Sequence, residues 1–395
     1  MVAGLLEADR EIVTFTYGRS YLARDDADAL YEPELPLRRG RIEPLVGLRM
    51  ASCIRDAGPD AWGQRVVLAR RAGHLGADRD TAELDQLTYL LESGSDRIGA
   101  LDFQRSATEY LPRHEPTRLE ELQEAAQALE EGRTLPEPLA VALLRGTSIG
   151  GARPKVLIED GGRHVIAKLS STSDPYPVVK AEAVGMELAR RVGIDVPATR
   201  VVESLGRDVL LVERFDRTAV PGERRLLVSG LTMLGLDEMM ARYATYPDLA
   251  DLIRAQFTDP QATLRELFAR IVFNVCIGNN DDHARNHAAF WDGQALTLTP
   301  AYDLCPQVRS GQESAQAMAI DRTGARASQL RVCRDAAANY QLGKRDATDI
   351  IETMVTVIRE QWSGAADAAR LTQLERAQLW ENQVLNPFIF YDWPA

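Results

Sequence analysis

The chain has 395 residues, of which 45% are hydrophobic and 26% charged, so it can hold two or three domains with substantial cores. Its formal net charge of −12 opposes unaided, non-specific binding to nucleic acid. The four cysteines form no CxxC pair, which argues against a zinc ribbon or a disulfide framework and suits a reducing cytosol. Early acidic residues argue against a signal peptide, and no apolar run approaches the roughly 18 residues of a membrane span. We therefore expect a soluble, cytoplasmic protein.

The first third of the chain mixes strand-like and helix-like patterns. Residues 11–17 alternate like a strand, and residues 61–73 follow a helical pattern that ends at a glycine. A polar stretch rich in Glu and Pro, about 106–138, bridges this part to the next and contains a short predicted helix at 119–129. We therefore expect a first subdomain over residues 1–105.

The residue composition changes at Arg145, where a Gly/Ser/Thr-rich loop begins. An Asp-Gly turn between two apolar runs then predicts a β-hairpin, because this dipeptide supports turns with positive φ. Apolar residues at i, i+4 and i+8 predict a helix over 178–193, with Gly193 as its stop. Two more strands are predicted at 199–204 and 207–215.

Beyond residue 230 the pattern becomes mostly helical. Residues 264–277 form one apolar helical face, which ends at Gly278. The polar loop "NNDDHARN" follows, and then "HAAFW", the turn "DG" and "ALTLT" predict a second hairpin. We expect the remainder, to about residue 385, to be helical, with 347–362 its clearest segment.

Polar groups suited to chemistry occur in a characteristic order along these parts. Lys168 lies on the second strand of the first hairpin, and Glu182 lies on the helix that follows. Asp281 and Asn286 are five positions apart in the loop after the apolar helix, and Asp303 follows the second hairpin. This is the order of parts in a protein-kinase-like phosphotransferase.

Phosphoryl transfer explains why these residue types are needed. A carboxylate must orient the acceptor hydroxyl, which is the role that Asp281 would fill. Asn286 and Asp303 would hold Mg²⁺ so that phosphate charge is neutralised. Lys168, fixed by Glu182, would bind the α- and β-phosphates.

The chain resembles the HipA-type serine/threonine kinases, the toxin halves of bacterial toxin–antitoxin pairs. The matching stretches are "TSIGGARPK", "IAKLS", "KAEAVGMELARRVGIDVP", "LLVERFDR", "GNNDDHARN" and "LTPAYDL", in family order. The first hundred residues, notably "ELPLRRG" and "SDRIGALDF", look like the family's N-terminal subdomain. The resemblance implies a two-lobed, protein-kinase-like α/β fold with a HipA-type N-terminal subdomain (1–105), the remainder of the N-lobe (106–230) and a helical C-terminal lobe (231–395).

The resemblance also implies roles for individual residues. Asp281 would be the catalytic base, supported by Lys168 and Glu182, and Asn286 and Asp303 would be the Mg²⁺ ligands. His283 matches a loop histidine that shapes the catalytic loop and approaches the nucleotide. The implied ATP-binding residues are Ile149, Gly150, Gly151, Ala152, Arg153, Pro154 and Lys155 at the phosphates, Lys168 at the α- and β-phosphates, and Glu213, Arg214 and Phe215 as the hinge that receives adenine.

Ser148 matches the serine that members of this family autophosphorylate. A phosphate there would add about −1.5 to −2 charges where the ATP phosphates must sit, so autophosphorylation would inhibit the enzyme. The sequence departs from ordinary kinases nearby, because the loop is neither GxGxxG nor a Walker A motif, and "YDL" stands at the DFG position. The hydroxyl-rich residues 170–177 lie where the family has a mobile segment that gates the substrate.

For partners, the resemblance implies a growth-arresting toxin held in check by a small helix-turn-helix antitoxin of the HipB type. That antitoxin also represses the operon, so operator DNA would be bound only through the complex. The resemblance further implies a protein substrate in translation, such as an aminoacyl-tRNA synthetase. It implies no membrane partner.

Three alternatives remain open from the residues themselves. A catalytically weak kinase fold could act as an antitoxin-binding co-repressor, and a small-molecule phosphotransferase of the aminoglycoside or choline type shares the Asp-x-x-x-x-Asn loop. A transition-metal site would need His283 and His287 on one helix at i, i+4, and the strand pattern that follows argues against that helix.

Overall fold

The computed structural model describes residues 1–72, 84–113, 117–146, 153–171, 174–309 and 311–393. The chain forms two compact units. Unit 1 comprises Met1–Ser173, Val202–Val228 and Phe290–Gln294, and unit 2 comprises Asp174–Val201, Ser229–Ala289 and Ala295–Ala395.

Unit 1 begins with a small antiparallel sheet in the order β1-β2-β3. The predicted strand at 11–17 is confirmed as β2, and alternation buries its residues Val13, Phe15 and Tyr17. The strands are β1 (Gly4–Asp9), β2 (Ile12–Tyr17) and β3 (Arg41–Ile42). Two short helices flank them, α1 (Arg19–Leu22) and α2 (Ser52–Arg55).

Four longer helices follow, and the two predicted ones are confirmed as α3 and α5. They are α3 (Ala61–Ala72), α4 (Gln86–Glu92), α5 (Leu119–Glu130) and α6 (Glu137–Gly146). The start of α3 is fixed by Asp60, whose Oδ1 accepts a hydrogen bond from the backbone N of Gly63 at 2.7 Å. Helix α6 was not predicted, because its sequence carries Pro138 and lies at the edge of the polar stretch.

A four-stranded sheet in the order β4-β5-β7-β6 carries the first predicted hairpin. Its strands are β4 (Lys155–Asp160), β5 (Arg163–Leu169), β6 (Thr199–Ser204) and β7 (Arg207–Glu213). Gly161 and Gly162 turn the hairpin with φ of +56° and +77°, which explains the Asp-Gly signal. One face of the sheet packs on the helices, since Val156, Ala167 and Leu169 share a buried cluster with Trp62 of α3, Leu122 of α5 and Leu143 of α6.

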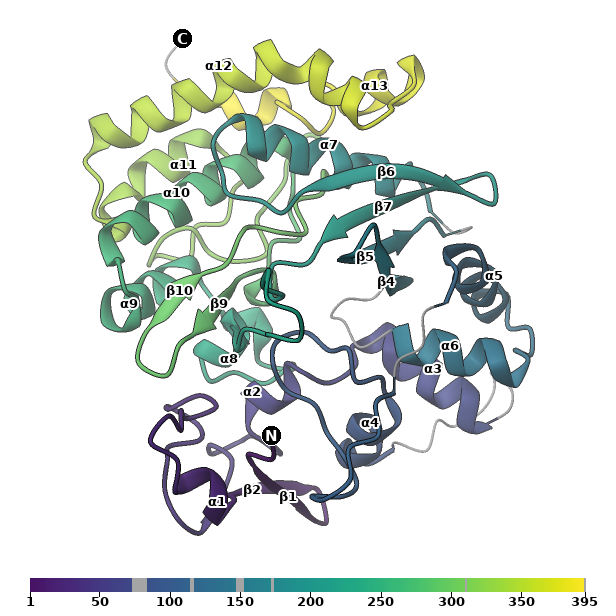
Figure 1. Cartoon of the computed structure of the whole chain (residues 1–395). Coiled ribbons are helices and arrows are strands. Elements are labelled where there is room, and N and C mark those ends of the chain that lie inside the picture. The colour runs from purple at the N-terminus through teal and green to yellow at the C-terminus, as the bar shows by residue number, and fades with distance from the viewer. Residues whose placement is uncertain (73–83, 114–116, 147–152, 172–173, 310, 394–395) are drawn as a thin grey trace. The chain divides into compact units, whose positions relative to one another are not determined.

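Unit 2 is mostly helical, as predicted for the chain beyond residue 230. Figure 1 shows α10, α11 and α12 stacked on one another, and α12 also packs against α7. The helices are α7 (Val178–Arg191), α8 (Gly230–Met233), α9 (Tyr246–Gln256), α10 (Pro260–Ile277), α11 (Leu330–Asp335), α12 (Lys344–Ala368) and α13 (Gln373–Leu379). Short 3-10 turns lie at η1 (Ala241–Tyr243), η2 (Ala284–Asn286), η3 (Ala337–Tyr340) and η4 (Pro387–Phe390).

The second predicted hairpin is confirmed within a three-stranded sheet in the order β10-β9-β8. These strands are β8 (Leu227–Ser229), β9 (Ala288–Trp291) and β10 (Leu296–Leu298). Gly293 turns the hairpin with a φ of +95°. The hairpin therefore ends just before the segment that holds Asp303.

One expectation about the C-terminal part is wrong. The described residues between 304 and 329 contain no helix, whereas the sequence analysis expected helix up to about residue 385. Their backbone instead bonds to the loop after α10, with Gln307 N donating to Gly278 O (3.0 Å) and Ala317 N donating to Asn280 O (3.0 Å). These tertiary bonds replace the i to i−4 bonds that a helix would make.

Within the described residues no helix is long and apolar enough to cross a membrane. All four cysteines are buried thiols, as packing residues would be. The C-terminal aromatic segment packs on unit 2, since the guanidinium of Arg359 lies 5.4 Å from the ring centre of Phe390.

Candidate active site

The polar loop that carries the candidate catalytic residues follows helix α10. The helix ends at Gly278, whose φ of +71° is left-handed. A Cβ at this position would lie only 2.7 Å from the backbone oxygen of Gln383, so both the conformation and the close approach require glycine. The sequence thus fixes where the loop of residues 279–287 begins.

Within this loop the side chain of Asn286 is bonded to the backbone of Asp281. The Asn286 Nδ2 donates a hydrogen bond to the backbone oxygen of Asp281 at 3.2 Å, and Asn286 N donates to His283 O at 2.8 Å. Because its amide nitrogen is engaged, the Oδ1 of Asn286 is turned away from that carbonyl. Asp281 is exposed, whereas Asn286 is buried. The loop therefore offers an accessible carboxylate and a fixed amide oxygen.

Asp303 lies in a strained segment that is tied to the same loop. Its φ of +61° is unusual for a residue other than glycine. Asn279 Nδ2 donates to the backbone oxygen of Asp303 at 3.4 Å and to Asn274 Oδ1 at 2.9 Å. On the other side, a Cβ at Gly185 of α7 would overlap the backbone oxygen of Leu304. The backbone around Asp303 is thus held between α7 and the loop after α10.

The electrostatic environment distinguishes Asp281 from an ordinary surface carboxyl. Although Asp281 is exposed, neighbouring residues partly enclose its carboxyl, and this partial loss of hydration raises its pKa; His283 opposes this rise, and Asp303 and Asp282 add to it. A carboxyl whose pKa is raised holds its proton more readily than usual. Such a group is suited to receive a proton from an acceptor hydroxyl.

Asp282 is a functional candidate that the sequence analysis missed. Its Oδ2 accepts hydrogen bonds from the Tyr246 hydroxyl (2.6 Å) and Asn274 Nδ2 (2.8 Å), and His287 Nε2 lies 3.0 Å away. Burial alone would raise the pKa of Asp282, but His287 and the hydrogen bonds from His287 and Tyr246 hold it below its ordinary value. The missed signal was Asn274, a polar residue in the buried, apolar end of α10.

The two loop histidines are not on a common helix. His283 and His287 both have extended backbones on either side of the short turn η2, as the strand pattern suggested. His287 is bonded to Asp282, so its Nε2 is committed to the protein. The arrangement required for the transition-metal alternative is therefore absent from this loop.

The candidate nucleotide residues of unit 1 lie on β4, β5 and β7. In the sheet register Lys168 is opposite both Lys155 and Leu210, so these three residues share one face. That face is opposite to the one packed on the helices, since Ala167 and Leu169 belong to the buried cluster.

Lys155 also has a partner that the sequence analysis did not predict. Its Nζ lies 3.3 Å from Oδ2 of Asp60, and the two side chains are only 7% and 2% exposed. Asp60 also caps α3, so this ion pair joins the first residue of β4 to the start of that helix. Lys155 is thus anchored inside unit 1.

The predicted hinge follows β7. Arg214 N donates to His164 O at 3.0 Å, which continues the pairing with β5 by one residue. The Arg214 guanidinium is buried and paired with Asp96 (2.9 Å) and Asp216 (2.8 Å). Phe215 packs edge-on against Phe290, with ring centres 5.9 Å apart. The side chains of the hinge are therefore structural, and its backbone is what a ligand could contact.

Most of the predicted phosphate-binding loop lies outside the described residues. Ser148, Ile149, Gly150, Gly151 and Ala152 lie outside the described residues. Arg153 and Pro154 are described, and Pro154 O accepts a hydrogen bond from Leu169 N at 3.0 Å. Glu182 is buried on α7, but it belongs to unit 2 and Lys168 to unit 1, so their pairing stays a prediction.

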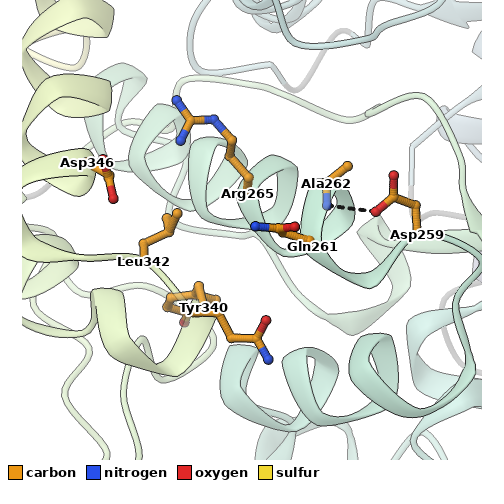
Figure 2. Close-up of a pocket in the computed structure, with 8 residues that line it drawn as sticks. Asp259, Gln261, Ala262, Arg265, Tyr340, Leu342 and Asp346 are labelled. Atoms are coloured by element: carbon orange, nitrogen blue, oxygen red, sulfur yellow. Dashed lines mark hydrogen bonds between the residues drawn. The ribbon is translucent and has the colours of Figure 1, made fainter.

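A separate cavity of about 410 Å³ lies at the start of α10 (Figure 2). Its lining residues are Asp259, Gln261, Ala262, Arg265, Tyr340, Gln341, Leu342 and Asp346. The dashed bond in Figure 2 is the cap of α10, in which Ala262 N donates to Asp259 Oδ1 at 3.1 Å. None of the predicted site residues that the structure describes lines this cavity.

The chain has a kinase-like α/β fold, and comparison with known proteins identifies its family. The HipA-like C-terminal domain model matches residues 147–362, and the HipA N-terminal domain model matches residues 1–104. The chain therefore belongs to the HipA family.

Two curated relatives share part of this sequence. The serine/threonine-protein kinase toxin HipA of Shewanella oneidensis is 29% identical over 201 residues, which cover 44% of this chain and 46% of the relative. The putative kinase Y4mE of Sinorhizobium fredii is 30% identical over 268 residues, which cover 62% of this chain and 61% of the relative. The chain thus spans about half to three-fifths of the length of these relatives.

A solved structure supports the fold over nearly the whole chain. The Shewanella oneidensis complex of HipA, HipB and operator DNA matches with a TM-score of 0.72 at 19% identity, covering 98% of this chain and 95% of that one. This likeness confirms the predicted α/β, protein-kinase-like fold of HipA type.

Proposed function

We propose that this protein is an ATP- and Mg²⁺-dependent protein kinase that phosphorylates serine or threonine. The carrying observation is the loop after α10, where Asn286 is bonded to the backbone of the exposed Asp281. The five-residue spacing from Asp281 to Asn286 is that of the base and the metal-binding Asn in kinase catalytic loops. Relatives named as kinases support the same activity.

The residues present fit Mg²⁺. The described residues contain no group of three or more His, Cys, Asp or Glu that could hold a metal. Mg²⁺ does not need such a cage, because it commonly takes one or two protein oxygens and completes its shell with water and phosphate. Asn286 Oδ1 and the Asp303 carboxylate would supply those oxygens. When bound, the ion neutralises phosphate charge.

Asp281 would orient the acceptor hydroxyl and receive its proton. In that step a bond forms between the acceptor oxygen and the γ-phosphorus, the bond to the β-phosphate oxygen breaks, and ADP leaves. The raised pKa of Asp281 and its exposure both suit this role.

The remaining nucleotide assignments rest on the family resemblance. Lys168, with Glu182 as its partner, would bind the α- and β-phosphates, and residues 149–155 would line them. The backbone of Glu213 to Phe215 would receive adenine, and His283 would approach the nucleotide.

We propose the toxin role on the same basis. The structural match is to HipA solved with HipB and operator DNA, which supports a HipB-like helix-turn-helix antitoxin as partner of this chain. The net charge of −12 supports DNA binding only through that antitoxin. A cytoplasmic location, a target such as an aminoacyl-tRNA synthetase, and the division at residues 105 and 230 remain part of the proposal.

Labelled ATP tests the proposed activity directly. With ATP labelled at the γ-phosphate and Mg²⁺, the protein should label protein acceptors, and hydrolysis of those acceptors should release phosphoserine or phosphothreonine. Chelation of Mg²⁺ should abolish the labelling. Label found only on small amino-sugar acceptors, or on no acceptor, would contradict the proposal.

Two further measurements test the biological part. Overproduction should arrest growth, and Asp303→Ala should relieve the arrest; persistent toxicity of that variant would show that phosphorylation is not the cause. Mass spectrometry after incubation with ATP should find phosphate on Ser148. Its absence would remove self-inactivation and leave the kinase activity standing.

A further inference from the structure

The buried carboxylate of Asp282 is the centre of a polar network in unit 2. Asp282 is only 2% exposed. Its Oδ2 receives the Tyr246 hydroxyl from α9 at 2.6 Å and Asn274 Nδ2 from α10 at 2.8 Å. His287, at the entrance to β9, places Nε2 3.0 Å from the same oxygen. Three elements thus converge on one oxygen, which is the pattern of an ionised carboxylate.

The network continues from Asn274 to the segment of Asp303. An ionised carboxylate only accepts hydrogen bonds, so Asn274 must present its amide nitrogen to Asp282. Its Oδ1 therefore faces the other way, where it accepts from Asn279 Nδ2 at 2.9 Å. Asn279 Nδ2 also reaches the backbone oxygen of Asp303 at 3.4 Å. The charge of Asp282 thus sets the direction of every hydrogen bond up to Asp303.

This connection matters because the backbone at Asp303 is strained. A φ of +61° in a residue other than glycine persists only when its surroundings hold it. Asn279 is one of those restraints. At its other end the network holds Asp282, the chain neighbour of the exposed Asp281. The network therefore anchors both the loop of residues 279–287 and the segment of Asp303, which carry the proposed chemistry.

We propose that Asp282 is a positioning residue for phosphoryl transfer, which holds Asp281 directly and the Asp303 segment through Asn274 and Asn279. The inference rests on the proposed function, because it assigns Asp281 and Asp303 the roles of base and metal ligand. Asp282 itself touches neither substrate nor metal. Its effect is on geometry.

Asp282→Asn tests the first half of the inference. An amide can donate to Asn274, which lets Asn274 rotate and deprives Asn279 of its acceptor. We expect an intact fold by circular dichroism, a fall in kcat of about 10²-fold, and a KM for ATP within about threefold of wild type. We also expect Mn²⁺, measured by electron paramagnetic resonance with a non-hydrolysable ATP analogue, to bind about tenfold more weakly.

An exchanged pair tests the direction of the network. In the double variant Asn274→Asp/Asp282→Asn the amide and carboxylate trade places, and the carboxylate introduced on α10 can again accept from Asn279. We expect this double variant to regain most of the Mn²⁺ affinity and of the kcat that Asp282→Asn loses. Asn274→Asp alone puts two carboxylates at hydrogen-bonding distance. Because they repel each other, this single variant should have a lower Mn²⁺ affinity and a lower kcat than the double variant.

Two other variants separate this role from a general packing effect. Tyr246→Phe removes one donor to Asp282 but leaves the Asn274 branch, so Mn²⁺ affinity should stay within about twofold. Asn279→Ala cuts the last link and leaves the donors to Asp282, so it should weaken Mn²⁺ binding as Asp282→Asn does. It also carries the test if Asp282→Asn does not fold.

The outcomes distinguish the inference from the function on which it rests. A wild-type protein that transfers no phosphate to any protein defeats the proposed function, and the inference with it. Transfer by wild type with unchanged kcat and Mn²⁺ affinity in Asp282→Asn or Asn279→Ala defeats the inference alone. A double variant no better than Asp282→Asn also overturns it.

Discussion

Asp281 and Asp282 are neighbours in the chain with opposite environments. Asp281 is exposed and its pKa is raised, whereas Asp282 is buried and its pKa is lowered by His287 and by hydrogen bonds. Asp281 is therefore accessible to a substrate, whereas Asp282 anchors the loop through its hydrogen bonds. The two carboxylates are therefore not interchangeable.

A buried charge network in unit 1 gives a second prediction at the residue scale. Asp216 accepts hydrogen bonds from Arg214 and Arg217 and also from the backbone N of Gly99 (2.7 Å). Asp216→Asn removes one of the two carboxylates that Arg214 and Arg217 share, the other being Asp96, so we expect a loss of about 3 kcal/mol in the free energy of unfolding in urea. Asp26→Asn, at an exposed ion pair with Arg24, should lower the free energy of unfolding much less.

The same carboxylate predicts a dependence of stability on pH. Burial would raise the pKa of Asp216, but Arg214 and Arg217 hold it below its ordinary value. As pH falls, Asp216 is therefore protonated in the unfolded chain before it is protonated in the folded protein. The free energy of unfolding falls as pH falls from about 3.9, the ordinary pKa of an Asp carboxyl, through the lower pKa of Asp216 in the folded protein. In Asp216→Asn the slope over this window should be shallower; an unchanged slope would contradict the assigned pairing.

At the scale of elements, α7 meets the segment after β10 with almost no space between their backbones. A Cβ at Gly185 would overlap the backbone oxygen of Leu304, next to Asp303. We expect Gly185→Ala to lower the free energy of unfolding by about 1–3 kcal/mol, because the helix and the segment must move apart. Gly311→Ala, where no atom lies within 4 Å, is the matched control. Equal stability of the two variants would show that the contact is looser than described.

Elements with a strong local signal could be predicted from the sequence. The two hairpins carry Asp-Gly turns, and α10 carries a continuous apolar face and a left-handed glycine stop. Residues 304–329 could not be predicted, because their backbone bonds to the distant loop at 278–280 rather than to itself. Local patterns do not record such tertiary partners.

In the candidate site, too, local features could be predicted from the sequence and tertiary contacts could not. The spacing of Asp281 and Asn286 and the hairpin before Asp303 are local features, so the sequence indicated them. Asp282 could not be assigned a role, since its partner Tyr246 lies 36 positions away and no motif records the bond. The Asp60 partner of Lys155 is likewise visible only in the folded unit.

At the scale of the whole molecule, the proposed function requires phosphoryl transfer that depends on Asp281. The most direct measurement is the initial rate of γ-phosphate transfer from labelled ATP to protein, for wild type and Asp281→Asn at equal concentration. Asp349→Asn, an exposed change on α12, is the matched control. We predict a fall of about 10²- to 10⁴-fold for Asp281→Asn and no fall for the control. Equal rates for wild type and Asp281→Asn would contradict the central claim.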